Sequence, residues 1–289
     1  MAVNRLKIAI LPNLKKPQAC LYTKKVVNIL NKLGASCLLL EGTFDDIPTE
    51  LVNYFNNIDE MIFKSDIVIT IGGDGTIIHS AKDAARFEKP VLGINLGRVG
   101  FVAGLEVEEL DKLRALVEGD YHVENRMMLS IEIMGSKGTK KLTALNDVVV
   151  SRGALSRIID LNVKFNNNKI CKYRADGLIV STPTGSTAYS LSAGGPVIEP
   201  QMRSILLTPI CSHSLFARPV IFGETAELSI QSAPVENTEV FLTVDGEDSV
   251  VIDASDIITV RKSEVSARII KLSDKDFYQI LNEKLSKGK

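Results

Sequence analysis

The sequence predicts an α/β N-terminal domain with a parallel sheet, followed by an all-β C-terminal domain of layered antiparallel sheets or a sandwich. Strand-like and helix-like segments alternate up to about residue 120, as in α/β domains. Closely spaced β segments separated by turn residues follow them. Apolar residues then fall on one helical face near the end of the chain, which predicts a tail helix packed back on the first domain. The expected ranges are 1–121, 122–270 and 271–289.

The first domain is expected to begin with a strand. Its predicted elements, in order, are strand 6–11, helix 24–33 closed by Gly34, strand 36–40, strand 66–71, helix 77–87 and strand 90–95. Alternation of this kind argues for a parallel sheet with helices on both faces. Ligands of such sheets gather at the carboxyl ends of the strands, where Asp74 and Asn95 are expected.

The second domain is predicted to consist mainly of closely spaced strands. Its predicted strands are 129–134, 141–145, 148–150, 158–165, 178–180, 205–210, 226–230, 240–244 and 257–260. Turn residues such as Asn166-Asn167-Asn168 and Asp245-Gly246 separate most of them, which favours antiparallel pairing. The boundary between the domains is expected within 119–126, and the tail helix carries Phe277, Ile280, Leu281 and Leu285 on one face.

Charge and hydropathy exclude several classes of partner. The 289 residues include 34 basic and 35 acidic side chains, so no strong field would recruit nucleic acid or an anionic membrane. No apolar stretch approaches the roughly 18 residues that a bilayer span needs. Met1-Ala2-Val3-Asn4-Arg5 leads into a strand-like run rather than a signal peptide, so we expect a cytoplasmic protein.

The four cysteines, Cys20, Cys37, Cys171 and Cys211, lie far apart and form no Cys-x-x-Cys motif. We therefore expect buried reduced thiols rather than a structural zinc site.

The most informative motif is Gly72-Gly73-Asp74-Gly75-Thr76, which lies where the strand ending at Ile71 meets a helix. Glycines permit close approach, and the N–H groups and positive dipole end of the following helix suit a phosphate group. The acid in this loop would repel phosphate unless it binds a metal or accepts a proton from a hydroxyl, both of which are tasks of a phosphoryl-transfer site. The alternative is a plain tight turn in which Asp74 caps the helix.

This loop fits neither of two common nucleotide fingerprints. Ile78 stands where a dinucleotide fingerprint requires glycine or alanine, and the chain contains no Gly-x4-Gly-Lys-Ser/Thr. The pattern resembles the phosphate loop shared by NAD kinases, diacylglycerol and sphingoid lipid kinases and, more distantly, 6-phosphofructokinases. Other motifs are needed to distinguish among these families.

A second motif runs from Arg174 through Asp176 into a loop crowded with hydroxyls, and it ends at Gly194-Gly195-Pro196. Small side chains that donate and accept hydrogen bonds suit ribose, amide and adenine edges. The alternative is a surface turn that caps a short helix. A third motif, Asn146-Asp147, reads by itself as a turn before a strand.

Taken in order, these motifs identify a resemblance to the bacterial NAD kinase family. The matching segments are Gly-Gly-Asp-Gly-Thr at 72–76, Leu-Gly-Ile-Asn-Leu-Gly-Arg-Val-Gly-Phe at 92–101, Asn-Asp at 146–147, Asp-Gly-Leu-Ile-Val-Ser-Thr-Pro-Thr-Gly-Ser-Thr-Ala-Tyr at 176–189 and Val-Asp-Gly-Glu at 244–247. The resemblance implies transfer of the γ-phosphoryl of ATP to the 2′-hydroxyl of the adenosine ribose of NAD, with a divalent cation, magnesium by preference. It also implies a homodimer or homotetramer whose active sites lie at subunit interfaces.

The resemblance implies a set of site residues. Asp74 would be the general base with Gly75 beside it, orienting the hydroxyl and accepting its proton late in the reaction. Asp147 stands where many relatives carry Glu, which keeps the charge and shortens the reach. Arg174 would clamp a pyrophosphate or else form a surface ion pair with Asp176. The remaining implied dinucleotide contacts are His79, Asn146, Arg157, Asp176, Thr187, Ala188, Tyr189, Ser190, Leu191, Ser192 and Glu247.

Several alternatives stay open at this point. The metal ligands are unknown, because magnesium commonly takes one or two carboxylates plus nucleotide phosphates. The competing functions are a lipid or sugar kinase of the same superfamily and a sensor that binds NAD or NADP without turnover. ATP or polyphosphate as donor, NAD or NADH as acceptor, and inhibition by NADP are not decided by the sequence.

Overall fold

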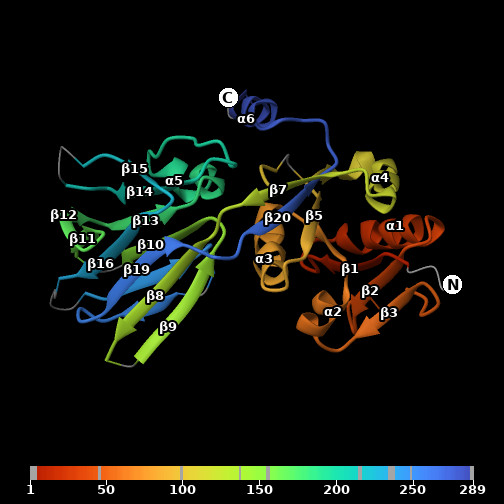
Figure 1. Ribbon diagram of the computed structural model, residues 1–289, viewed down its shortest axis with the longest axis horizontal. Helices are drawn as coiled ribbons and strands as arrows, with labels where there is room; N and C mark the ends of the chain where they lie inside the picture. The colour runs from red at the N-terminus through yellow and green to blue at the C-terminus, as the bar shows by residue number, and fades with distance from the viewer. Residues whose placement is uncertain are drawn as a thin grey trace. The chain divides into compact units, whose positions relative to one another are not determined.

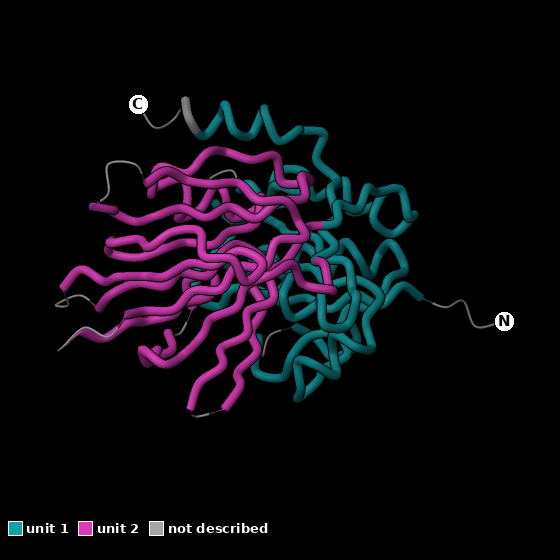
Figure 2. The backbone as a smooth tube through the Cα atoms, turned by 60° about the vertical axis from the view of Figure 1, so that its left-hand side comes forward, with its two compact units in different colours: residues 1–125, 267–289 teal, residues 126–266 magenta. Residues whose placement is uncertain are grey.

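The computed structural model describes residues 5–44, 47–97, 100–136, 138–153, 157–213, 217–233, 238–247 and 249–286. The chain divides into two compact units, one of residues 1–125 with 267–289 and one of residues 126–266 (Figure 2). The divisions at 125/126 and 266/267 lie close to the expected 121/122 and 270/271, and the last strand before the tail belongs to the first unit.

The first unit is built on one sheet with strand order β3-β2-β1-β4-β5-β20-β7, and β6 pairs with β5 (Figure 1). The strands are β1 Lys7–Pro12, β2 Ser36–Leu40, β3 Val52–Phe55, β4 Ile67–Gly72, β5 Pro90–Asn95, β6 Leu105–Glu106, β7 His122–Arg126 and β20 Ala267–Lys271. Strands β1 to β6 and β20 are joined by parallel pairings. The predicted parallel sheet is therefore confirmed.

The first unit also contains six helices within its described residues. They are α1 Ala19–Lys32, α2 Ile58–Lys64, α3 Asp74–Ala85, η1 Val107–Lys112, α4 Leu113–Glu118 and α6 Phe277–Ser286. Helix α1 packs on β1, β2 and β4 and also against α4, whereas α3 packs on β4, β5 and β20. Every residue of β4 and β5 is buried, as expected for central parallel strands covered on both faces. Gly34 closes the turn after α1 with φ +87°, as predicted.

Helix α3 begins at Asp74, three residues before the predicted start at Ile77. Gly73 is the extended N-cap, and the N–H of Ile77 donates to the carbonyl of Gly73 at 3.0 Å, which closes the first turn. The apolar periodicity starts only at Ile77, so hydrophobic pattern alone places the helix too late. Asp74 is thus the first helical residue rather than part of an irregular loop.

The second unit contains two six-stranded sheets within its described residues, with orders β15-β14-β13-β10-β17-β18 and β12-β11-β16-β19-β8-β9. All their pairings are antiparallel. One cluster of buried side chains, including Val150 and Leu178 of the first sheet and Leu161 and Ile258 of the second, joins the two sheets. The predicted layered antiparallel domain is confirmed.

The strands of this unit are β8 Leu129–Gly135, β9 Gly138–Ala144, β10 Asp147–Arg152, β11 Ile159–Phe165, β12 Asn168–Ala175, β13 Gly177–Ser181, β14 Ser204–Ile210, β15 Val220–Gly223, β16 Glu227–Ser232, β17 Val240–Val244, β18 Val250–Ile252 and β19 Ile257–Lys262. Two short helices, η2 Thr184–Thr187 and α5 Tyr189–Ser192, follow β13. Strands β12 and β15 escape the sequence prediction because most of their side chains are exposed and show no clean alternation.

The tail forms α6 and packs on the first unit, as predicted. The ring of Phe277 lies 6.0 Å from that of Phe101, and Ile280 is buried. The side chain of Asp276 accepts the N–H of Gln279 at 2.7 Å and so caps the helix. No helix in the described part of the chain is long and apolar enough to cross a bilayer.

The prediction that all four cysteines are buried is wrong for three of them. Cys37 is buried in β2, and burial raises the pKa of its thiol to about 12. Cys20 and Cys171 are half-buried, Cys171 against the core of the second unit, and Cys211 is exposed just after β14. Across the described ranges, no three His, Cys, Asp or Glu side chains are grouped as metal ligands.

Gly104 offers a test of how β20 is joined to the first unit. Its N–H donates to the carbonyl of Gly93 at 3.0 Å, and its carbonyl accepts the N–H groups of Leu272 and Ser273 at 3.0 Å each. A Cβ atom here would collide with the backbone oxygen of Ile270. We expect Gly104→Ala to lower the free energy of unfolding by about 1–3 kcal/mol in urea denaturation.

The matched control is Gly223→Ala, where a Cβ meets nothing within 4 Å. This control is expected to stay within about 0.5 kcal/mol of the wild type. Equal stabilities of the two variants would contradict the close approach of the chain at Gly104.

Candidate functional site

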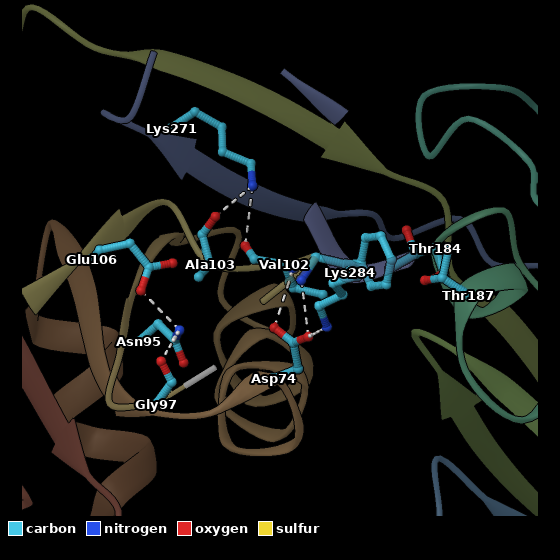
Figure 3. A network of polar contacts seen from close by, with 11 residues as sticks. Asp74, Asn95, Gly97, Val102, Ala103, Glu106, Thr184, Thr187, Lys271 and Lys284 are labelled. Carbon is cyan, nitrogen blue, oxygen red and sulfur yellow. Dashed lines mark hydrogen bonds and ion pairs between the residues drawn. The ribbon is translucent and has the colours of Figure 1, made fainter. Parts of the chain in front are cut away.

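The carboxylate of Asp74 is held by the backbone of the segment that follows β5. Oδ2 accepts the N–H of Phe101 at 2.9 Å, and Oδ1 accepts the N–H of Val102 at 3.2 Å. Figure 3 shows the carboxylate turned toward Val102 and toward Lys284 of α6. Asp74 therefore does not cap its own helix, so the alternative of a helix-capping acid is wrong.

The segment after β5 is itself fixed by its neighbours. The ammonium of Lys271 on β20 donates to the carbonyls of Ala103 at 2.6 Å and Val102 at 3.3 Å (Figure 3). A Cβ atom at Gly100 would collide with Oδ1 of Asp74, so glycine is required for this close approach. The position of the carboxylate is thus determined by main-chain donors on a supported segment.

Asn95, at the end of β5, takes part in a second polar contact of this segment. Its amide donates to the carboxylate of Glu106 at 2.8 Å (Figure 3). Burial raises the pKa of Glu106, and the hydrogen bond from Asn95 partly opposes that shift. Asn95 therefore stabilises the turn after β5, and its amide is directed at Glu106 and not at Asp74.

A pocket of about 680 Å³ lies at the carboxyl ends of β1 and β4. Gly73, Gly75, Thr76 and His79 line it from α3, and the segment after β1 lines it with Asn13 and Lys16. The amide of Asn13 donates to Oγ1 of Thr76 at 2.8 Å, and Lys16 donates to the carbonyl of Leu96 at 3.3 Å. The helix N-terminus and a nearby ammonium give this pocket the electrostatics that favour an anion.

The second unit has a pocket of about 420 Å³ that contains four of the predicted site residues, Asn146, Asp147, Ala188 and Tyr189. Tyr189 is 47% exposed, whereas Asp147 is 5% exposed. The pocket therefore combines an accessible aromatic ring with a buried acid, a mixture suited to a flat polar ligand.

Asp245 lines this pocket and holds the main chain next to it. Its carboxylate accepts the N–H groups of Leu145 at 3.0 Å, Asn146 at 2.8 Å and Asp147 at 3.0 Å. The residue adopts a left-handed φ of +51°, which the turn after β17 requires. Sequence reasoning places Asp245 in a family motif but assigns it no role in the site.

Burial and the nearby charge of Asp245 raise the pKa of Asp147 to about 7. Below that pH, Asp147 is a neutral acid that donates a hydrogen bond instead of only accepting them. Oδ1 of Asn146 is a buried acceptor that has no hydrogen-bond partner among the described residues. Asn146 and Asp147, which both line the pocket, thus contribute one buried acceptor and one acid of raised pKa.

Hydroxyl groups of the loop after β13 form hydrogen bonds within the unit, so they stabilise the fold more than the sequence alone indicates. Thr182 donates to the carbonyl of Leu145 at 2.6 Å, and Ser190 shares a hydrogen bond of 2.8 Å with Thr208. A Cβ atom at Gly185 would collide with the backbone of Asn146, so this loop and the turn at Asn146 are in close contact. Thr187 and Leu191 are half-buried and Ser192 is exposed at the end of α5.

Asp176 forms its ion pair with Arg152, whose Nε lies 2.6 Å from Oδ1. The ion pair considered between Arg174 and Asp176 is therefore replaced by one from the end of β10, a residue that sequence reasoning missed. Arg174 is exposed on β12, and Arg157 and Glu247 are exposed outside helices and strands. Arg98 and Val99 of the predicted motif lie outside the described residues.

Comparison with known proteins matches both units to one family. The model for the ATP-NAD kinase N-terminal domain matches residues 8–121, and that for the ATP-NAD kinase C-terminal domain matches residues 145–272. NAD kinases of Caldanaerobacter subterraneus and Acetivibrio thermocellus are each 38% identical to the chain, over 97% of it and over 99% and 97% of their own lengths.

Two solved structures are similar as well. The NAD kinase of Archaeoglobus fulgidus in complex with ATP is 26% identical with a TM-score of 0.75, over 97% of this chain and 99% of that one. The yeast NADH kinase complexed with NADH has a TM-score of 0.88 at 24% identity, over 98% of this chain and 88% of that one, and it shows the likeness of the fold.

The raised pKa of Asp147 predicts a pH-dependent stability. Between about pH 4 and pH 7 the folded state keeps a proton that the unfolded state releases, so this group's contribution to stability falls as pH rises. Asp147→Asn has no charge to bury. We expect the stability of this variant relative to wild type to be higher at pH 8 than at pH 5, by at most about 3 kcal/mol in urea denaturation.

Asp160→Asn is the control, because its carboxylate pairs with Lys172 at 2.8 Å on a more exposed part of the same unit. No comparable gain at pH 8 is expected for it. If the stabilities of wild type and Asp147→Asn change in parallel from pH 5 to pH 8, the pKa of Asp147 is not raised in the folded protein.

Proposed function

Since the chain belongs to the NAD kinase family, we propose that it transfers the γ-phosphoryl group of ATP to the 2′-hydroxyl of the adenosine ribose of NAD and produces NADP. The observation that carries this proposal is the carboxylate of Asp74, held by two main-chain N–H groups at the first turn of α3. Such a group is suited to receive the proton of an attacking hydroxyl.

In this proposal Asp74 is the catalytic base. Each of its oxygens accepts one backbone N–H, and a carboxylate has about four lone-pair sites, so capacity remains for a ribose hydroxyl. The carboxylate orients the hydroxyl and accepts its proton as the new P–O bond forms, while the P–O bond to ADP breaks. Positioning supplies much of the rate enhancement in such reactions.

The phosphate chain of ATP is proposed to bind at the start of α3. Gly73, Gly75 and His79 line the pocket there, together with the ammonium of Lys16. Free N–H groups of a first helical turn and a nearby cation both favour phosphate oxygens. Magnesium is proposed to arrive with the ATP phosphates as part of the substrate, because no ligand cluster of its own is found in the described part of the chain.

The dinucleotide is proposed to use the pocket of the second unit. Protonated Asp147 donates to a ligand acceptor, Asn146 lines the pocket beside it, and the exposed ring of Tyr189 stacks on a base. Arg152 fixes Asp176 at the edge of β13. The further contacts proposed from the family resemblance are Arg157, Arg174, Thr187, Ala188, Ser190, Leu191, Ser192 and Glu247.

We further propose a cytoplasmic homodimer or homotetramer whose subunits complete each other's active sites. The support for this assembly is the resemblance to the family. Light scattering coupled to size-exclusion chromatography distinguishes monomer, dimer and tetramer, and a monomer of full activity would rule out shared sites.

The direct test is an assay of the purified protein with magnesium, NAD and either ATP or polyphosphate, coupled to an NADP-specific dehydrogenase. NADP formation is the expected result. Phosphorylation of a lipid or sugar without NADP would instead identify another kinase of the superfamily, and calorimetric binding of NAD without any product would identify a sensor.

Asp74→Asn tests the proposed base. The amide keeps the shape of the side chain but cannot take a proton, so we expect kcat to fall by about 10²-fold or more while NAD still binds in calorimetry. Asp59→Asn, which removes an exposed carboxylate paired with Arg86, is the control and is expected to keep wild-type turnover. Full turnover by Asp74→Asn would remove Asp74 from the catalytic role.

A further inference from the structure

Lys284 of α6 places its ammonium beside the proposed catalytic base. Its Nζ lies 3.5 Å from Oδ2 of Asp74 and 4.2 Å from the centroid of the Phe101 ring. Figure 3 shows the Lys284 side chain ending beside the carboxylate of Asp74. Phe101 is also the residue whose N–H holds Asp74, so one residue contacts both the base and the cation.

The tail helix delivers Lys284 in a defined way. Phe277, Ile280 and Lys284 are spaced three and four residues apart, so they share one face of α6. Phe277 packs on Phe101, Ile280 is buried, and the capping carboxylate of Asp276 fixes the start of the helix. The lysine therefore reaches Asp74 from a docked helix and not from a free tail.

The ammonium of Lys284 offsets the negative charge of Asp74, but the ion pair is too long to hold the ammonium in one position. A distance of 3.5 Å is longer than the 2.7–2.9 Å of a strong charge-assisted hydrogen bond. The side chains of Lys284 and Asp74 are 33% and 28% exposed, so solvent and ligands can approach both. The aromatic face of Phe101 gives the ammonium a second favourable contact, which does not depend on the carboxylate.

A cation at this position reduces an electrostatic repulsion within the proposed site. A free carboxylate at the start of α3 repels the phosphate oxygens that the helix N-terminus attracts. The ammonium of Lys284 offsets that repulsion while both main-chain N–H groups still hold the carboxylate in place.

We propose that Lys284 is a positioning residue for phosphoryl transfer, which acts through Asp74 by neutralising its charge as the phosphates of ATP approach. Helix α6 is accordingly part of the active-site machinery of this chain. This inference rests on the proposed function, because it assigns Lys284 a task at the ATP end of that site.

The test compares Lys284→Gln, Lys284→Arg and Lys275→Gln in the coupled assay. Lys284→Gln is expected to raise KM for ATP about 5- to 10-fold and to leave KM for NAD within about twofold. Lys284→Arg keeps the charge and restores most of the loss. Lys275 pairs with Glu283 at 2.7 Å beside the same helix, so Lys275→Gln controls for a weakened α6 and is expected to match the wild type.

A second arm separates action through Asp74 from direct phosphate binding. In the Asp74→Asn background there is no charge to neutralise, so adding Lys284→Gln is expected to leave KM for ATP unchanged. A full effect in that background, an unchanged KM in the single variant, or a gain in activity on removing the lysine would each overturn the proposal. If the wild type makes no NADP, the proposed function fails; if it does and Lys284→Gln behaves like it, this inference alone fails.

Discussion

The pairing of one side-chain carboxylate with two consecutive main-chain N–H groups is the contact on which the first unit's chemistry depends. Asp74 reaches Phe101 and Val102 because α3 starts directly after β4, and because Gly100 lets the chain pass close to the carboxylate. Parallel strands β4 and β5 end at the same edge of the sheet, which brings these two segments together. The fold thus positions the acid with backbone donors, whose geometry varies less than that of side chains.

The second unit uses a carboxylate in a similar manner for a different purpose. Asp245 gathers the N–H groups of three consecutive residues, Leu145, Asn146 and Asp147, and so fixes the turn before β10. Burial, together with the nearby charge of Asp245, raises the pKa of Asp147 to about 7. One carboxylate therefore binds three main-chain N–H groups, and the neighbouring acid, whose pKa is raised, lines the pocket.

Sequence patterns predicted the architecture well because it depends on hydrophobic periodicity. They located β4, β5, the central strands of the second unit and the tail helix, whose apolar faces are regular. They placed the start of α3 too late, since glycine and aspartate carry no apolar signal. Strand β12 was missed because its side chains are mostly exposed, and β20 because its place beside β5 depends on contacts far apart in sequence.

The same distinction holds for the site. Gly-Gly-Asp-Gly-Thr, Asn-Asp and the motif that contains Asp245 were identified from the sequence, but the main-chain contacts of Asp245 were not. Arg152 and Lys284 make tertiary contacts that no local pattern indicates. The most direct measurement is a crystal structure of the protein with NAD and a non-hydrolysable ATP analogue. The account predicts a carboxylate oxygen of Asp74 within about 3 Å of the 2′-hydroxyl of the adenosine ribose. A 2′-hydroxyl out of hydrogen-bond reach of Asp74, with another side chain against it, would contradict the account.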